Sequence, residues 1–217
     1  MVTRSAASGM PGTPLLRPGW RADSVVSSEP FTWAVIPGFF TAGTADTLLR
    51  TFPATGFGLA GNGTPGFRFY YRPLVRKGYV HGSVRALPES WQELAHTMIS
   101  KTYAARLCEL VSVPPPGGWT IDAGLCVYSA NCSLRPHTDR PIRVLTQVTY
   151  LQDRWDPAWG GTLRILRSGR ADDVAAEIAP EHNQSVVFVR SDESWHAVMP
   201  VTQARRRRRS LIFHLTA

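Results

Sequence analysis

The second half of the chain consists of short segments in which apolar and polar residues alternate. These segments are rich in β-branched and aromatic residues, most are bounded by turn-forming residues, and they span 119–128, 143–151, 162–166, 184–190, 197–201 and 208–215. Alternation with a period of two predicts strands with one buried face. Short strands at this density are typical of an antiparallel sandwich or barrel, and a double-sheet jelly roll fits best.

The first half of the chain predicts helices. The apolar residues 31–40 predict a strand, and the segment after them places Leu48, Leu49 and Phe52 at helical spacing. Residues 88–110 carry a continuous apolar stripe at the same spacing, which predicts one long helix. These helices flank the strands, so the expected fold class is mainly β with flanking helices (α+β), around a double-stranded β-helix, cupin-like core.

Glycine, proline and small polar residues divide the chain further. Residues 1–30 are rich in them and show no periodicity, which predicts a flexible N-terminal tail. Residues 31–217 then form a single domain, with the jelly-roll core at about 119–216. Within this domain the glycine-rich stretch 58–75 predicts a long loop that covers an active site.

Composition excludes several classes of function. The formal net charge is +8, but five of the positive charges lie in the single run 205–209. Such a run is more often a solvated loop or strand end than a nucleic-acid groove, so a nucleic-acid partner is disfavoured. No apolar run is long enough to cross a membrane, and we expect a cytoplasmic protein. Three cysteines without CxxC spacing favour neither a disulfide framework nor a zinc site.

Two histidines and an aspartate form a candidate metal site. In a strand or strand end, His137 and Asp139 project to the same side because one residue separates them. His196 follows a strand that is apolar enough to be buried, so its ring can also face inward. Two imidazoles and one carboxylate hold iron(II) on one face and leave the other coordination positions open for oxygen chemistry.

A candidate anion site follows in the arginine run. A strand that starts here turns Arg208 and Ser210 to one face, and an inward-facing arginine needs an anion. A guanidinium can grip a carboxylate through two parallel hydrogen bonds, and a serine hydroxyl can add a third. A shift of two residues would select Arg206 instead, and all five arginines could also face solvent.

Together these motifs resemble the iron(II)- and 2-oxoglutarate-dependent dioxygenases, specifically their prolyl-hydroxylase-like branch. The similarity also covers the blocks GLCVYSANCSLRPHTD, TQVTYLQDRWDPAWGGTLRIL and SVVFVRSDESWHAVMPV, in order. It implies Fe(II) as cofactor, with 2-oxoglutarate and O2 as cosubstrates. It further implies that Tyr128, Thr146 and Tyr150 lie in the cosubstrate pocket beside Arg208 and Ser210.

The resemblance implies hydroxylation of an unactivated C–H bond, with release of succinate and CO2. The presence of Asp139 argues against halogenation, because halogenating relatives have a small residue there. We expect a small-molecule substrate, such as an amino acid or natural-product intermediate, that is anionic, amino-acid-like or carrier-tethered. The candidate substrate-binding residues are Arg68, Tyr70, Arg72, Arg135 and His214.

Three other functions stay open. One is hydroxylation of prolyl or other residues in a protein or peptide. Another is repair-type demethylation of nucleic acid, although relatives of that kind usually carry an arginine at the position of His214. The third is a non-enzymatic jelly-roll binding module without metal. The sequence leaves the oligomeric state open.

Overall fold

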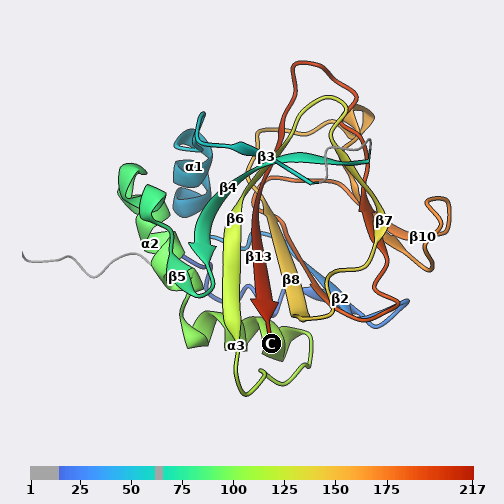
Figure 1. Ribbon diagram of the computed structural model, residues 1–217, viewed down its shortest axis with the longest axis horizontal. Coiled ribbons are helices and arrows are strands. Elements are labelled where there is room, and N and C mark those ends of the chain that lie inside the picture. Colours follow the sequence, from blue (N-terminus) through green and yellow to red (C-terminus); the bar gives the residue numbers. More distant parts are fainter. Residues whose placement is uncertain (1–14, 62–65) are drawn as a thin grey trace, which may run out of the picture.

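Two antiparallel sheets meet at one long strand, β4 (Phe67–Arg76), in a computed structural model that describes residues 15–61 and 66–217. The larger sheet has the order β1-β2-β11-β8-β13-β6-β4, and the smaller has the order β7-β12-β9-β10. Strand β4 pairs with β6 of the first sheet and with β7 of the second (Figure 1). This arrangement confirms the predicted jelly-roll core.

The strands are short, as the alternating pattern predicts. Their bounds are β1 Val25–Ser27, β2 Trp33–Ile36, β3 Gly58–Ala60, β5 Tyr79–Val80, β6 Thr120–Tyr128, β7 Ser133–His137, β8 Arg143–Tyr150, β9 Leu163–Leu166, β10 Val174–Ile178, β11 Ser185–Val189, β12 His196–Val198 and β13 Arg208–Thr216. Every strand predicted in the second half overlaps one of them. Strands β7 and β10 were not predicted, because one contains a proline and the other has few β-branched or aromatic residues.

Three helices cover the outer face of the larger sheet (Figure 1). They are α1 (Ala42–Arg50), α2 (Glu89–Met98) and α3 (Lys101–Leu110), with two short 3-10 turns at Gly82–Ala86 and Pro157–Trp159. The structure corrects the prediction of one helix over 88–110. The chain breaks at Ser100, whose side chain accepts a hydrogen bond from the Tyr103 amide and so starts a new helix. No helix in the described residues is long and apolar enough to cross a membrane.

The predicted loop 58–75 is mostly strand. β3 and β4 pair with each other, and β4 continues as a central strand of the fold. The aromatic residues Phe67, Phe69 and Tyr71 alternate along β4, and aromatic side chains favour a pleated, half-buried surface over a loop. Residues 62–65 lie outside the described residues.

Residues 15–30, which the sequence pattern assigns to the flexible tail, pack on the domain. Trp20 is buried, and its ring meets Phe39 edge to face at a centroid distance of 5.4 Å. Strand β1 pairs with β2 and extends the larger sheet. Residues 1–14 lie outside the described residues.

Two apolar cores result from the two-sheet architecture. One lies between the helices and the larger sheet, and it is built around Trp91, Leu125 and Phe213. The other lies between the sheets, where Tyr150 of β8 packs in one cluster with Ile165 of β9. The space between the sheets also holds the cavity described below.

A buried polar network ties α3 to the larger sheet. The Tyr103 hydroxyl donates a hydrogen bond of 2.6 Å to the Gln147 side-chain oxygen. The Gln147 amide group in turn donates to the Ser185 hydroxyl at 2.8 Å. Buried polar atoms are costly to leave unpaired, so this network fixes where the helix sits.

We expect Tyr103→Phe to lower the free energy of unfolding by about 1–3 kcal/mol, because it leaves the Gln147 oxygen unpaired in the core. Urea denaturation measures this change. Tyr79→Phe is the matched control, since Tyr79 is 79% exposed. Equal stability of the two variants would show that the network contributes nothing.

Candidate metal centre and its cavity

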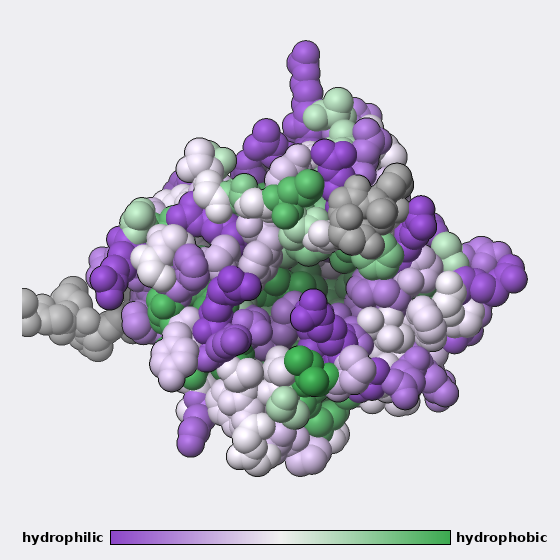
Figure 2. Space-filling view, viewed as in Figure 1, coloured by the Kyte–Doolittle hydropathy of each residue, from purple (hydrophilic) through white to green (hydrophobic). Residues whose placement is uncertain are grey.

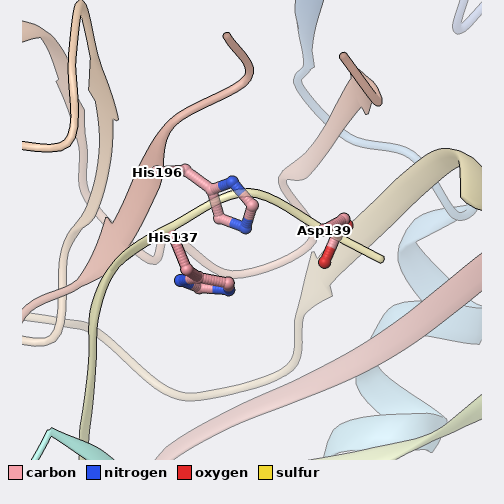
Figure 3. A group of neighbouring side chains, drawn as sticks. All are labelled: His137, Asp139 and His196. Carbon is pink, nitrogen blue, oxygen red and sulfur yellow. The ribbon is translucent and has the colours of Figure 1, made fainter. Parts of the chain in front are cut away.

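Strand pairing brings the two candidate histidine ligands together. His137 ends β7 and His196 begins β12, and these residues are direct partners in the antiparallel register. Their ring centroids lie 4.3 Å apart. One ligand atom from each of His137, Asp139 and His196 lies within 4.8 Å of the others, and Figure 3 shows the three side chains gathered at one point.

Both imidazole rings are oriented for metal binding. Nδ1 of His137 lies 2.8 Å from the Arg135 carbonyl oxygen, and Nδ1 of His196 lies 2.9 Å from the Ser194 carbonyl oxygen. A carbonyl only accepts, so each Nδ1 carries the proton and each Nε2 presents a lone pair. This is the arrangement of metal-bound histidines in proteins, so the residues fit a divalent metal such as iron(II).

Asp139 supplies the negative charge of the group. It forms an ion pair with Arg143, and Oδ2 accepts a hydrogen bond of 2.5 Å from the Thr146 hydroxyl. Burial raises the pKa of Asp139, but His196, Arg143 and the Thr146 hydroxyl outweigh burial and hold the pKa at about 2. The carboxylate is therefore charged at neutral pH and available to a cation.

Two histidines of the cavity are held neutral. Burial, followed by the proximity of His137, lowers the pKa of His196 to about 4. Burial and then the charge of Arg143 lower the pKa of His214 to about 3. Nδ1 of His214 lies 2.9 Å from the Thr146 hydroxyl oxygen, which also contacts Asp139.

A buried arginine without an acidic partner lies farther along the space between the sheets. Arg208 is 1% exposed and pairs with no carboxylate among the described residues. Its guanidinium carbon lies 4.9 Å from the centre of the Tyr128 ring and 4.8 Å from the centre of the Tyr150 ring. Nη1 of Arg208 lies 3.5 Å from the Ser210 hydroxyl oxygen. Arg208 Nε and the Tyr150 hydroxyl are buried without a hydrogen-bond partner in the described structure. These orphaned donors fit an anion.

One cavity of about 380 Å³ connects the candidate metal ligands with Arg208. The other residues that line it are largely apolar, among them Phe67, Phe69 and Ile212. Figure 2 shows the molecule hollowed near the centre of this view, with hydrophobic residues in the depth and hydrophilic ones around it. The volume suits a small organic ligand.

Of the five candidate substrate residues, one lines the cavity. His214 lines the cavity, whereas four others do not, namely Arg68, Tyr70, Arg72 and Arg135. Arg72 is buried and donates instead to the Thr55 carbonyl at 2.5 Å, and Tyr70 lines a separate groove.

Sequence reasoning missed two cationic residues of the cavity, Arg140 and Arg143. Arg143 stands four residues after Asp139, and this spacing was the available indication, since both flank the turn that leads into β8. The ion pair between Arg143 and Asp139 places the arginine beside the candidate metal ligands. Arg140 gives no such indication in the sequence.

Residues 123–215 match the 2OG-Fe(II) oxygenase superfamily. The matched residues run from strand β6 to strand β13 and make up the core of the fold. The enzyme is thus a 2-oxoglutarate-dependent dioxygenase, and its cofactor and cosubstrates are Fe(II), 2-oxoglutarate and O2. No curated protein sequence matches the chain.

Solved structures share the fold of this oxygenase. A prolyl-4-hydroxylase from Pseudomonas putida has a TM-score of 0.63 at 21% identity, over 85% of this chain and 91% of that one. A Trichoplax adhaerens prolyl hydroxylase, solved with a peptide fragment of hypoxia inducible factor, has a TM-score of 0.65 at 15% identity, over 85% and 83%. The α-ketoglutarate-dependent epimerase SnoN from nogalamycin biosynthesis has a TM-score of 0.58 at 14% identity, over 85% of this chain and 78% of that one.

We expect the metal-free oxygenase to lose stability as the pH falls from 6.5 toward 4. His196 and His214 stay neutral in the folded state, whereas the unfolded chain protonates them near pH 6.5, so acid favours unfolding. Urea denaturation at pH 7 and pH 5 measures the loss. In His214→Asn the drop in the free energy of unfolding between pH 7 and pH 5 should be smaller by about 1–2 kcal/mol. An unchanged pH dependence would contradict the lowered pKa of His214.

We expect Gly161→Ala to weaken 2-oxoglutarate binding by about tenfold, or about 1.4 kcal/mol. Gly161 has a φ of 72°, and an added Cβ would lie 3.2 Å from the Trp155 ring and 3.3 Å from Cδ of Arg208, so it crowds the surroundings of the arginine. Calorimetric titration of the Mn(II)-loaded protein measures the affinity. Gly169→Ala is the control, because its Cβ would crowd Trp195 and not Arg208. Equal affinities for the two variants would show that Gly161 leaves Arg208 in place.

Proposed function

We propose that this oxygenase hydroxylates an unactivated C–H bond of a small anionic molecule, such as an amino acid or a natural-product intermediate. The observation that carries the proposal is one cavity with two complementary ends. The triad of His137, Asp139 and His196 lies at one end, and Arg208, which has no carboxylate partner among the described residues, lies at the other.

The triad end holds Fe(II). The Nε2 atoms of His137 and His196 and an oxygen of Asp139 are the donors, and their backbone and side-chain partners fix their orientation. Three protein ligands leave positions free for a bidentate cosubstrate and for O2. Bound Fe(II) and 2-oxoglutarate supply the oxidant for C–H hydroxylation from O2, and succinate and CO2 are the other products.

The other end binds the distal carboxylate of 2-oxoglutarate. Among residues 205–209 only Arg208 is buried, which supports its choice over Arg206. Arg206 is exposed, and its guanidinium lies 3.8 Å from the centre of the Trp159 ring. Arg208 donates to the carboxylate, and the hydroxyls of Ser210 and Tyr150 add hydrogen bonds. A buried cation thereby gains the counter-charge that the protein itself does not provide.

The charges of the cavity favour an anionic substrate. Three arginines line it, namely Arg140, Arg143 and Arg208, against the single carboxylate of Asp139. Iron(II) adds two positive charges and 2-oxoglutarate adds two negative ones, so an excess of positive charge remains. A carboxylate or phosphate on the substrate compensates this excess, and Arg140 and Arg143 are the residues that contact it.

The experiment is anaerobic addition of Fe(II) and 2-oxoglutarate, followed by the visible charge-transfer band of their complex. We expect the band in the wild type and its loss in His196→Ala. Arg208→Ala should need at least about tenfold more 2-oxoglutarate for the same intensity, equivalent to about 1.4 kcal/mol.

Arg206→Ala is the matched control for Arg208→Ala, because it removes the same charge from the exposed part of the run. In this control the band should need the same concentration of 2-oxoglutarate as in the wild type. A folded wild type without a band would refute the metal assignment. A weaker affinity in Arg206→Ala with an unchanged Arg208→Ala would move the anchor to Arg206.

A further inference from the structure

Two residues outside the metal-ligand set, Thr146 and His214, contact Asp139 in series. We propose that they are positioning residues, which hold the Asp139 carboxylate in place through a chain of hydrogen bonds running from His214 to Thr146 to Asp139. The proposal rests on the proposed function, because it assumes that Asp139 binds the metal. It adds a role for Thr146, expected in the cosubstrate pocket, and for His214, expected to bind substrate.

The direction of the chain follows from counting protons. The Asp139 carboxylate, which forms an ion pair with Arg143, only accepts, so the single proton of the Thr146 hydroxyl goes to Oδ2 at 2.5 Å. The same hydroxyl oxygen lies 2.9 Å from Nδ1 of His214. Having no second proton to give, the hydroxyl accepts, and His214 donates through Nδ1–H. The structure therefore assigns one tautomer to His214.

The backbone makes this chain rigid. Thr146 of β8 and His214 of β13 are direct cross-strand partners, and β13 is also paired with β6 on its other side. Both residues are thus placed by regular ladder hydrogen bonds in the middle of the larger sheet. Asp139 lies in the connection between β7 and β8, outside any strand, so it gains orientation from strands that it does not belong to.

The two carboxylate oxygens of Asp139 have different partners. Arg143 pairs with Oδ1, and Thr146 donates to Oδ2. Each oxygen retains lone pairs for a metal, because a carboxylate offers about four acceptor positions. Arg143 is one long, partly exposed side chain, whereas Thr146 is short and buried. The buried hydroxyl therefore restricts the carboxylate more strongly.

The assigned tautomer also fixes what His214 presents to the cavity. With the proton on Nδ1, Nε2 carries a lone pair, and His214 lines the cavity. His214 thus offers an acceptor, and a substrate group that faces it is a donor.

The first test reads the tautomer directly in the metal-free protein. Two-dimensional 1H–15N NMR of 15N-histidine-labelled protein separates protonated from unprotonated ring nitrogens, and His214→Asn identifies the His214 signals. We expect the Nδ1–H tautomer in wild type and in Thr146→Ser, and a shift toward Nε2–H in Thr146→Val. An Nε2–H tautomer in wild type would overturn the proposal without any further variant.

The second test measures Co(II) binding through its visible absorption, as a probe of the metal site. We expect Thr146→Val to weaken binding about 10–100-fold, the range for lost partners of a metal ligand, and Thr146→Ser to restore it. Thr149→Val is the matched control on the same strand, since Thr149 hydrogen-bonds Ser185 and lies away from the cavity. This control should bind Co(II) as the wild type does.

The outcomes separate the proposal from the proposed function. If wild type fails to bind Co(II), or binds it equally in His196→Ala, the metal site itself is refuted. If wild type binds Co(II) through His196 but Thr146→Val matches Thr149→Val, the metal site stands and the positioning role of Thr146 and His214 is wrong.

Discussion

The charge of Asp139 is the constraint on which the site depends. Among the described residues it is the single carboxylate in a cavity that three histidines and three arginines also line. The neighbouring cations and the Thr146 hydroxyl keep it ionised in spite of burial. Without that charge the histidines would face positive arginines with nothing to attract a metal cation. With it, one end of an otherwise cationic cavity can bind iron(II).

The fold separates the three candidate metal ligands from Arg208. His137 and His196 come from the smaller sheet, where β7 and β12 are paired, and Arg208 comes from the larger sheet. Apolar residues line the cavity between them, and the burial of Asp139, His196 and Arg208 strengthens their electrostatic interactions. Strand β4, which belongs to both sheets, sets their relative position.

The run of five arginines shows how one stretch of sequence serves two environments. Arg205, Arg206 and Arg207 lie before β13 and are exposed, whereas Arg208 is the first residue of the strand and points between the sheets. Their side chains are identical, so composition alone cannot distinguish them. The start of the strand and its alternation decide which guanidinium is desolvated.

Local patterns were sufficient for several features. Alternation predicted the strands of the second half except β7 and β10, and the spacing of His137 and Asp139 predicted that they share one site. The same patterns failed at Ser100, where a capping side chain divides the predicted helix, and over β4, where glycines suggested a loop. They also left Arg72 as a candidate for substrate binding, although its side chain is buried against the Thr55 carbonyl.

The sequence by itself determined the fold class, and it predicted a candidate triad and, as one alternative, an inward arginine, because these follow from periodicity and from the chemistry of a few residue types. Only the tertiary structure decided which cations reach the cavity, as with Arg143, and that Thr146 and His214 meet Asp139. Those contacts join residues of three separate segments. Their proximity depends on strand pairing and turn geometry, which no local pattern encodes.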